Sequence, residues 1–540
     1  MSTESARSTN SASRRHVLRA LAVAVTLVAG VTPGWGGTAL AAEPGGPGGP
    51  AEPETYTLTI RHLDRSGQAP AHYRTSVTGI SGPGASLSVQ PHDASGVTTV
   101  RLPKGRYLLE SDLYTNDVAD GDDWIVQPRL DLDHDTTVTV DARTTAPVDL
   151  RPPDRSAAFV TSGMFLEVTH QGATRMASIV KATPTLRVAH LGPEAEAGSV
   201  RQWFDSYWST ATGGYALGRT HTGSRALTGL AHHYTARELG TLRIRGAAGP
   251  GAEGSAVFDV SPAPGPSAGS TVGGSFSMSL PATATVYVTP ERGPWDVTFA
   301  ASDNWKNRYF ADGVAVPAGE TATHTFGNPV FAPALPPGRG VERDGDTITT
   351  RIPLLADGDG HMSAAPPFDT AYTSLFRDGV LVGARSGADA AAGRAAFTVP
   401  PGRASYRLAA TVTRKAASGA TTRVNASWTF ASATTARPAA VPVSVVRFSP
   451  GLSPAGTAPA GSAIRVPVTV QGAAAEGRVR SLTVSASTDG GASWTGLPVE
   501  AGAVTVQNPA AGATVSLRAE LTDTDGNTLD QTVLDAYRAE

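Results

Sequence analysis

Cysteine is absent from this chain of 540 residues. That absence excludes a disulfide framework, a thiolate metal site and a cysteine nucleophile. Charge is also scarce, since 17% of residues are charged and the formal net charge is −3. So small a charge argues against nucleic acid and anionic membrane surfaces as partners, because both select for basic patches. Sequence patterns for catalysis are missing too: the serines nearest to a nucleophile-elbow pattern lie in loop-like sequence, and there is no His-Glu-x-x-His zinc helix.

The first 42 residues have the pattern of a secretory signal. Arg14 and Arg15 precede an apolar run from Ala20 to Val31, and residues 39–42 form a small-residue cleavage site. The apolar run is too short to cross a bilayer, which needs roughly 20 residues. The arginine pair resembles a twin-arginine export signal, with an ordinary secretory signal as the alternative. We therefore predict that the mature chain is secreted and released into the extracellular space.

Short alternating segments fill the rest of the chain. Residues 56–60 and 97–102 each alternate apolar and polar side chains before a turn sequence, and no long helical period follows. Strand, Pro-x-Gly turn and strand recur from Val100 and from Phe397, but no fixed period links the copies. This pattern predicts an all-β protein made of tandem sandwich modules of immunoglobulin-like, fibronectin-like or transthyretin-like type.

Proline-rich segments indicate where the modules end. Proline lacks the backbone donor that an interior strand needs, so we take residues 147–153, 332–338 and 436–441 as linkers. The predicted organisation after the signal peptide at residues 1–42 is a Pro/Gly-rich linker at 43–54, a sandwich at 55–152, a larger β region of one or two modules at 153–335, a sandwich at 338–437 and an immunoglobulin-like module at 438–540.

The segment from Ser487 to Trp494 fits the Asp-box pattern, Ser/Thr-x-Asp-x-Gly-x-Ser/Thr-Trp. In such a hairpin the Asp489 carboxylate binds its own turn, Gly491 adopts a positive φ, and the Trp494 indole packs back on the sheet. The motif recurs on unrelated extracellular β-proteins. It predicts a structural turn and says nothing of chemistry.

Two groups of residues are candidate ligand sites. Asp131, Asp133 and Asp135 alternate, which would place them on one face of a strand as weak calcium ligands. A solvated strand face and loop is the alternative, which the lack of a full calcium loop with a glycine and a terminal Glu favours. Trp203, Tyr207 and Trp208 lie in one aromatic cluster. They could stack on sugar rings, with packing in a core as the alternative. We expect no other metal or cofactor.

The closing sequence carries a resemblance. The block SLTVSASTDGGASWTGLPV, followed by the segment from Asn508 to Tyr537, resembles the last module of large secreted subtilisin-like serine peptidases of actinomycetes. The phrases TLTIRHLDRSGQAP and TTVRLPKGRYLLESDL are similar to the β-rich regions after the peptidase domain of those enzymes. The catalytic motifs of that family have no counterpart here. The resemblance therefore implies a stand-alone set of accessory modules.

These observations predict a secreted, multi-domain β-sandwich protein without a catalytic centre. Its role would be extracellular binding or structure, as a monomer, with an unidentified protein or glycan as partner. The alternative is a secreted hydrolase, acting on peptides or glycans, whose site lies in residues 153–335. Acids or histidines facing a cleft in that region would favour the enzyme, whereas a bare groove or an exposed aromatic strip would favour binding.

Overall fold

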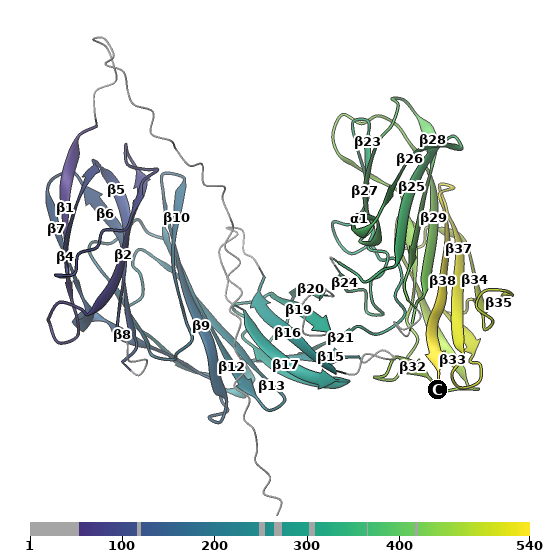
Figure 1. Ribbon diagram of the computed structural model, residues 1–540, viewed down its shortest axis with the longest axis horizontal. Helices are drawn as coiled ribbons and strands as arrows, with labels where there is room; N and C mark the ends of the chain where they lie inside the picture. Colours follow the sequence, from purple (N-terminus) through teal and green to yellow (C-terminus); the bar gives the residue numbers. More distant parts are fainter. Residues whose placement is uncertain are drawn as a thin grey trace, which may run out of the picture.

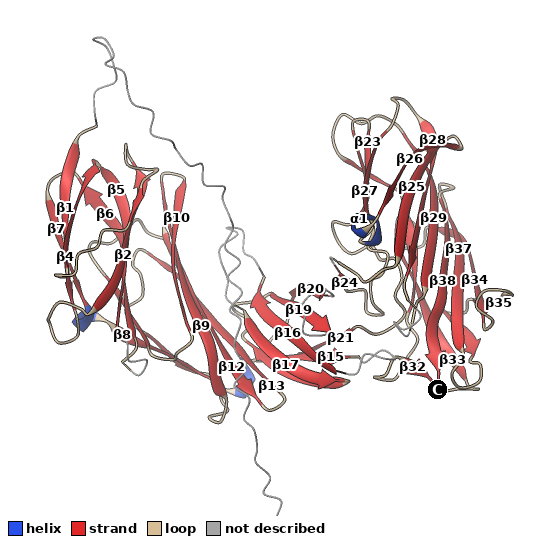
Figure 2. Cartoon of the chain, in the orientation of Figure 1, coloured by secondary structure: helices blue, strands red, loops and turns tan. Residues whose placement is uncertain are grey.

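The computed structural model describes residues 53–115, 120–247, 254–263, 273–301, 308–363, 365–415 and 420–540. Strands dominate this part of the chain, and its one α-helix is the short α1 (Ala388–Ala391). Figure 2 shows strands throughout both halves of the molecule. The all-β prediction is confirmed. The predicted signal peptide with Arg14 and Arg15 lies outside the described residues, and none of the helices within them is long and apolar enough to cross a bilayer.

Four sheets form the N-terminal half (Figure 1). The first, in strand order, is β4 (Val97–Pro103), β1 (Thr55–Leu63) and β7 (Thr136–Asp141). The second is β14 (Leu230–His233), β8 (Ala146–Arg151), β11 (Leu186–His190), β6 (Asp122–Leu132), β5 (Gly105–Tyr114), β2 (His72–Ser81) and β3 (Ser88–Val89). The third is β10 (Ala173–Lys181), β9 (Ala158–His170), β12 (Val200–Thr210), β13 (Gly213–Gly223), β18 (Ala282–Val288), β15 (Gly240–Gly246) and β21 (Thr321–Phe326). The fourth is β17 (Gly274–Leu280), β16 (Gly254–Pro262), β19 (Trp295–Ala301), β20 (Arg308–Val314) and β24 (Met362–Ser363).

The two middle sheets of this half are buried on both faces. In β6, Ile125 belongs to the hydrophobic core shared with the first sheet, whereas its neighbour Trp124 belongs to the core shared with the third. In β12, Phe204 lies in that same second core, and Trp203 packs in the next one with Phe258 of the fourth sheet. Because successive side chains of a strand point to opposite faces, each middle sheet serves two cores at once.

The predicted boundary at 152/153 is wrong, because the sheets cross it. Strands β11 and β14 come from the later region and join the second sheet beside β8 and β6. The proline-rich segment at 147–153 is not a linker but contains most of β8, which has a neighbour on each side. Pro147 is tolerated because it is the second residue of β8, where pairing with β11 covers only two positions.

Three sheets form the C-terminal half. The fifth sheet, in strand order, is β27 (Arg394–Thr398), β23 (Thr347–Arg351), β22 (Gly340–Asp344) and β30 (Ala439–Val441). The sixth is β26 (Val380–Ser386), β25 (Thr370–Arg377), β28 (Ala404–Thr413), β29 (Arg423–Ser432), β38 (Thr528–Ala539), β37 (Thr514–Asp523), β34 (Val479–Ser487) and β35 (Thr495–Leu497), with β32 (Thr457–Ala458) paired to β38. The seventh is β31 (Ser444–Phe448), β33 (Ala463–Gly472) and β36 (Ala503–Gln507).

The sixth sheet runs through both predicted C-terminal modules. Strand β29 of the earlier module pairs antiparallel with β38 of the later one, from Arg423 opposite Leu534 to Thr429 opposite Thr528. The predicted linker at 436–441 is also wrong, since β30 within it pairs with β22. The two modules therefore share one sheet through their edges.

A buried arginine joins the two halves. Arg447 of β31 is 4% exposed and donates to the carbonyl oxygens of Ala332, Pro333, Ala356 and Asp357. Burial lowers its pKa to about 10. These carbonyls lie in two buried segments, one that follows β21 and one that precedes β24. Ala332 and Ala356 also bond each other in an isolated bridge, so the guanidinium adds further donors to backbone oxygens at this crossing. It holds the crossing between the halves in place.

Candidate functional site

The aromatic cluster proposed as a stacking platform lies inside the protein. Trp203 and Trp208 are each 7% exposed and Tyr207 is fully buried. Trp203 and Tyr207 fill the core on one side of β12, and Trp208 fills the core on the other. The stacking hypothesis is wrong, because a sugar ring needs an exposed aromatic face and this strand has none to offer. The physical reason is the double-sided burial of the third sheet.

The three candidate calcium ligands have separate partners. The Asp131 carboxylate accepts from Arg106 Nε at 2.7 Å and from Arg129 Nε at 2.6 Å. Asp133 contacts the His134 ring, and Asp135 Oδ1 accepts the Thr57 amide at 2.7 Å. Strand β6 ends at Leu132, so the chain turns before the other two acids and the expected common face does not form. Among the residues described, no three acidic or histidine side chains are grouped to hold a metal ion.

The Asp-box hairpin forms between β34 and β35. Asp489 accepts the Ser487 hydroxyl at 2.6 Å, the Ser493 amide at 3.0 Å and the Ser493 hydroxyl at 2.5 Å. The hydrogen bonds from Ser487 and Ser493 lower the pKa of this carboxyl. Gly491 has a φ of +91°, and a Cβ there would lie 3.0 Å from Leu534, so glycine is required. Trp494 is only half-buried, and its indole donates to the Gly491 carbonyl at 3.1 Å.

A hydroxyl–imidazole pair in the first module is inaccessible to a substrate. His62 Nε2 lies 2.7 Å from Thr75 Oγ1, which in turn lies 2.7 Å from Ser111 Oγ. All three side chains are at most 2% exposed, and His62 Nδ1 faces the Gly96 carbonyl rather than an acid. Nucleophilic catalysis needs a base that is oriented by a third group and open to substrate. This arrangement is a core network.

A very small cavity lies partly within residues 153–335, the region expected to hold a hydrolase site. A pocket of about 20 Å³ is lined by residues between Val148 and Trp208, with Asp149 as its acid. Asp149 pairs with Arg151 at 2.5 Å and with His233 at 2.9 Å. A volume of that size accommodates about one water molecule.

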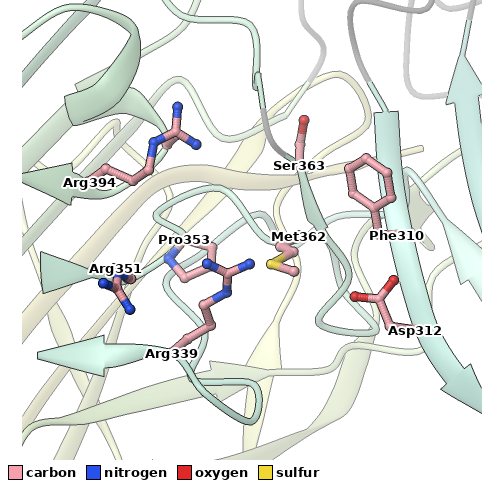
Figure 3. A pocket seen from close by; sticks show the side chains of 9 residues that line it. Phe310, Asp312, Arg339, Arg351, Pro353, Met362, Ser363 and Arg394 are labelled. Carbon is pink, nitrogen blue, oxygen red and sulfur yellow. The ribbon is translucent and has the colours of Figure 1, made fainter. Parts of the chain in front are cut away.

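The larger candidate site is a pocket of about 260 Å³ where the fourth and fifth sheets meet (Figure 3). Arginines form one wall and β20 with β24 forms the other. Its lining residues are Phe310, Asp312, Arg339, Arg351, Pro353, Met362, Ser363, Ala392 and Arg394. None of them stood out in the sequence, because they come from five separate segments.

Strand register places the three arginines side by side. Arg351 at the end of β23 lies directly opposite Arg394 at the start of β27. On its other side Arg351 is opposite Gly340 of β22, which directly follows Arg339. Arg394 pairs with Asp389 at 2.9 Å, whereas no acid in the described ranges pairs with Arg339 or Arg351. Like charges on directly opposed residues destabilise a sheet. The fold itself therefore gains nothing from this row.

The facing wall combines apolar surface with one acid. Phe310 of β20 pairs with Met362 of β24, and Asp312 follows two residues later on β20. Figure 3 shows Asp312 across the pocket from Arg339. Guanidinium groups bind carboxylate, phosphate or sulfate oxygens through several parallel hydrogen bonds. The pocket can therefore hold an anionic group at one wall and a hydrogen-bond donor at the other.

No protein-family model matches this chain, and no curated protein matches it. Several solved structures show low similarity to it. The TIE protein of Bacillus anthracis is 11% identical, covering 50% of this chain and 50% of its own, with a TM-score of 0.12. The alpha-2-macroglobulin of E. coli is 11% identical, covering 91% of this chain and 40% of its own, with a TM-score of 0.17. Two B repeat units of the collagen binding protein of Staphylococcus aureus are 11% identical, covering 67% of this chain and 94% of their own, with a TM-score of 0.13.

This chain thus spans half or less of the first two of those proteins. TM-scores of this size carry no argument about fold or function. The all-β class rests on the strands and sheets described above.

Proposed function

We propose that this protein is a secreted extracellular binding protein without a catalytic centre, and that the arginine pocket is its ligand site. The ligand carries a carboxylate, phosphate or sulfate group and, beside it, a hydroxyl or amine that reaches Asp312. The protein acts as a monomer and takes its ligand from an extracellular polymer, a glycan or a protein. The N-terminal signal pattern supports this location. The resemblance to accessory regions of secreted peptidases supports the binding role.

One observation carries the proposal: Arg351 and Arg394 oppose each other directly across two strands, with Arg339 beside them. Cross-strand repulsion of this kind costs roughly 0.2–1 kcal/mol of folding stability. An anion bound among the three guanidinium groups would reverse that cost. Arrangements that weaken the fold and strengthen binding are expected at functional sites.

Calorimetric titration tests the site with three probes, D-glucuronate, glycerol 3-phosphate and a sugar sulfate. We expect at least one probe to bind, and Arg351→Ala to weaken it about tenfold or more, since a charge-assisted hydrogen bond is worth ~1.5–3 kcal/mol. Arg403→Ala is the matched control, because Arg403 is an exposed arginine of the same half that lies outside the pocket. Without ligand, Arg351→Ala should melt at the same or a slightly higher temperature than the wild type.

Unchanged affinity in Arg351→Ala, or no binding of any probe, would contradict the site.

The absence of catalysis has a separate test. The purified mature chain is incubated with casein and with a fluorophosphonate that labels activated serines. We expect neither hydrolysis nor labelling. Stoichiometric labelling of one serine, abolished by its change to Ala, would make the protein a hydrolase.

The double variant Arg14→Lys with Arg15→Lys tests the export route. It should block secretion if the route is twin-arginine.

A further inference from the structure

A second pocket lies between the second sheet and the edge strand of the third. It has a volume of about 220 Å³ and is independent of the arginine pocket. Strands β2, β5 and β6 form its floor, and β10 covers it. The lining residues are Arg74, Ser76, Gln90, Glu110, Asp112, Trp124, Ser178 and Ile179.

Polar side chains occupy positions on a sheet face that is otherwise apolar. In one row across the sheet, Arg74 of β2 is opposite Asp112 of β5, and Asp112 is opposite Trp124 of β6. In the next row, Ser76 of β2 is opposite Glu110 of β5. The same face carries the hydrophobic core elsewhere, through Ile80, Leu108, Trp124 and Val126. The polar group therefore interrupts the second core where this face meets β10.

Burial of these acids is unfavourable for folding. Burial raises the pKa of Glu110 to about 7, even though the Trp124 indole donates to its Oε2 at 3.2 Å. Burial also raises the pKa of Asp112 despite the nearby charge of Lys181. Apolar side chains at both positions would extend the core without that cost. The arrangement calls for a role other than stability.

Asp112 has an acceptor that the protein leaves unused. The residue is 6% exposed, and its Oδ2 contacts Lys181 Nζ at 3.1 Å. Its Oδ1 is buried and has no hydrogen-bond partner. An unsatisfied buried carboxylate oxygen is among the most costly groups a fold can contain. A ligand that donates a hydrogen bond to Oδ1 would remove that penalty.

Two cations of β10 fix the cover of the pocket. Arg175 donates to the carbonyl oxygens of Gly79 at 2.6 Å and Ala85 at 2.7 Å. Six residues further along β10, Lys181 pairs with Asp112 and, at 3.0 Å, with Asp122 of β6. These contacts hold the cover strand against the second sheet on both sides of Ser178, so the pocket is preformed.

We propose that this pocket binds one neutral, polyhydroxylated ring, a single sugar unit of an extracellular glycan. Three acids, Glu110, Asp112 and Asp122, lie near two cations, Arg74 and Lys181. Because burial raises the pKa of Glu110 to about 7, the charges nearly cancel around neutral pH, and neither an anion nor a cation is favoured. Sugar hydroxyls donate and accept at once. They can supply the donor for Asp112 Oδ1 while they accept from Arg74 or Ser76. Polar side chains also outnumber the apolar Trp124 and Ile179 in the lining.

Ligand-observed NMR on the full mature chain tests the proposal. The probes are the methyl glycosides of glucose, galactose, mannose and N-acetylglucosamine, with n-butylamine as a cationic comparison. We expect saturable binding of at least one glycoside. Asp112→Leu should weaken it about tenfold or more, because the bound hydroxyl loses a charged acceptor. Glu110→Gln, which keeps the shape and hydrogen-bonding capacity of that side chain, should bind within a few-fold of the wild type.

Asp112→Leu leaves Lys181 its second partner, Asp122, but the variant could still fold poorly. Gln90→Ala supplies the second test, because Gln90 is an exposed pocket residue whose side chain no strand needs. It should weaken the glycoside a few-fold with the melting temperature unchanged. The proposal is overturned if no glycoside binds, if n-butylamine binds instead, or if folded Asp112→Leu and Gln90→Ala both bind like the wild type.

Discussion

The two halves of the molecule combine their modules in different ways. In the N-terminal half, neighbouring modules share a sheet through its two faces, so that β6 and β12 each contribute to two hydrophobic cores. In the C-terminal half, the modules share a sheet through its edges, where β29 pairs with β38. The modules of the first half are therefore coupled by side-chain packing, whereas in the second half backbone hydrogen bonds between β29 and β38 add to a shared hydrophobic core.

This difference appears in the burial of single strands. Strand β12 is buried at eight of its eleven positions, whereas β29 alternates buried with partly exposed residues. In a strand with one buried face, apolar and polar residues alternate, and this pattern predicts which side chains face the core. A strand buried on both faces lacks that alternation, so its sequence does not predict its faces in the same way. A change in β12 should consequently affect two cores, while a change in β29 or β38 should stay within the C-terminal half.

Removal of Arg292 gives the largest expected effect and tests the face-sharing half. Arg292 donates to Asp205 at 2.7 Å and 3.2 Å, and Asp205 is fully buried in β12. Arg292→Ala leaves that carboxylate without its cation and should cost about 3–5 kcal/mol of unfolding free energy. Urea unfolding with hydrogen exchange should show loss of protection on both sides of the third sheet.

The matched control is Arg292→Met combined with Asp205→Leu. Removal of both charges should restore much of the stability, because the pair is replaced by apolar side chains of similar size. Loss of protection confined to one core would contradict the idea that β12 couples two.

Gln531→Leu tests the C-terminal half. Gln531 of β38 is fully buried, donates to the Val446 carbonyl at 2.6 Å and accepts the Val446 amide at 3.2 Å. Leucine would leave both backbone groups of β31 unpaired, at a cost of roughly 2–4 kcal/mol. The unfolding transition of the C-terminal half should shift and that of the N-terminal half should stay. Gln507→Leu, at an exposed position, should change neither transition. If Gln531→Leu shifts both transitions, the two halves unfold as one cooperative unit.

The crossing between the halves should depend on pH. His324 Nδ1 lies 3.0 Å from His361 Nε2, and His361 Nδ1 lies 3.1 Å from Asp357. Burial and the neighbouring His361 lower the pKa of His324. Burial opposes protonation of His361, but the hydrogen bond and charge of Asp357, together with Asp359, raise its pKa. Arg447, the other cation that faces these acids, does not titrate in the range concerned.

The two shifts have opposite signs. A His324 with a lowered pKa contributes stability that is lost as the pH falls below about 6.5, where the unfolded imidazole becomes protonated. A His361 with a raised pKa contributes stability that is present below that value and is lost as the pH rises through its folded pKa. Protection of Ala332 and Ala356 from hydrogen exchange, corrected for intrinsic rates, should therefore be greatest near pH 6.5. His324→Gln should remove the loss of protection at low pH, and His361→Gln should remove the loss of protection at high pH. If neither variant changes the pH profile of protection, the two histidines do not control the stability of this crossing.

Trp494→Ala should have the smallest effect. Full burial of the indole would predict a loss of about 3–5 kcal/mol. Because the side chain is only half-buried in the hairpin, we expect about 1–2 kcal/mol instead, confined to the C-terminal transition. Thermal unfolding of the variant measures it. A loss as large as that of Arg292→Ala, or any change in the N-terminal transition, would mean that the hairpin is more tightly coupled to the rest of the molecule.

The sequence predicts local features well and long-range ones poorly. The alternation of short strands and the turn around Asp489 follow from side chains within a few residues of each other. The pairing of β8 with β11 and β14, or of β29 with β38, joins segments far apart in the chain, and no local pattern encodes it. The segment around Trp203 and Trp208 does carry a usable signal. Its aromatic residues stand in adjacent pairs, Trp203 with Phe204 and Tyr207 with Trp208, and adjacent side chains of a strand point to opposite faces.

Neither pocket could be predicted from the sequence, and the reason is the same for both. Arg351 and Arg394 become neighbours only through the register of β23 with β27. Glu110 and Asp112 stand two positions apart on β5, but nothing in the chain indicates that β10 covers them. The Asp131, Asp133 and Asp135 hypothesis failed in the opposite way, since a regular spacing in the sequence does not persist where the strand ends at Leu132.

The position of β38 in the sixth sheet has a mechanical consequence. This strand is flanked by β29 on one side and β37 on the other, so it has ladder hydrogen bonds along both edges. A force directed along β38 would load those bonds together in shear, whereas a force across the sheet would open them one after another. The C-terminal half should therefore resist a force along its strands more strongly than a force across them.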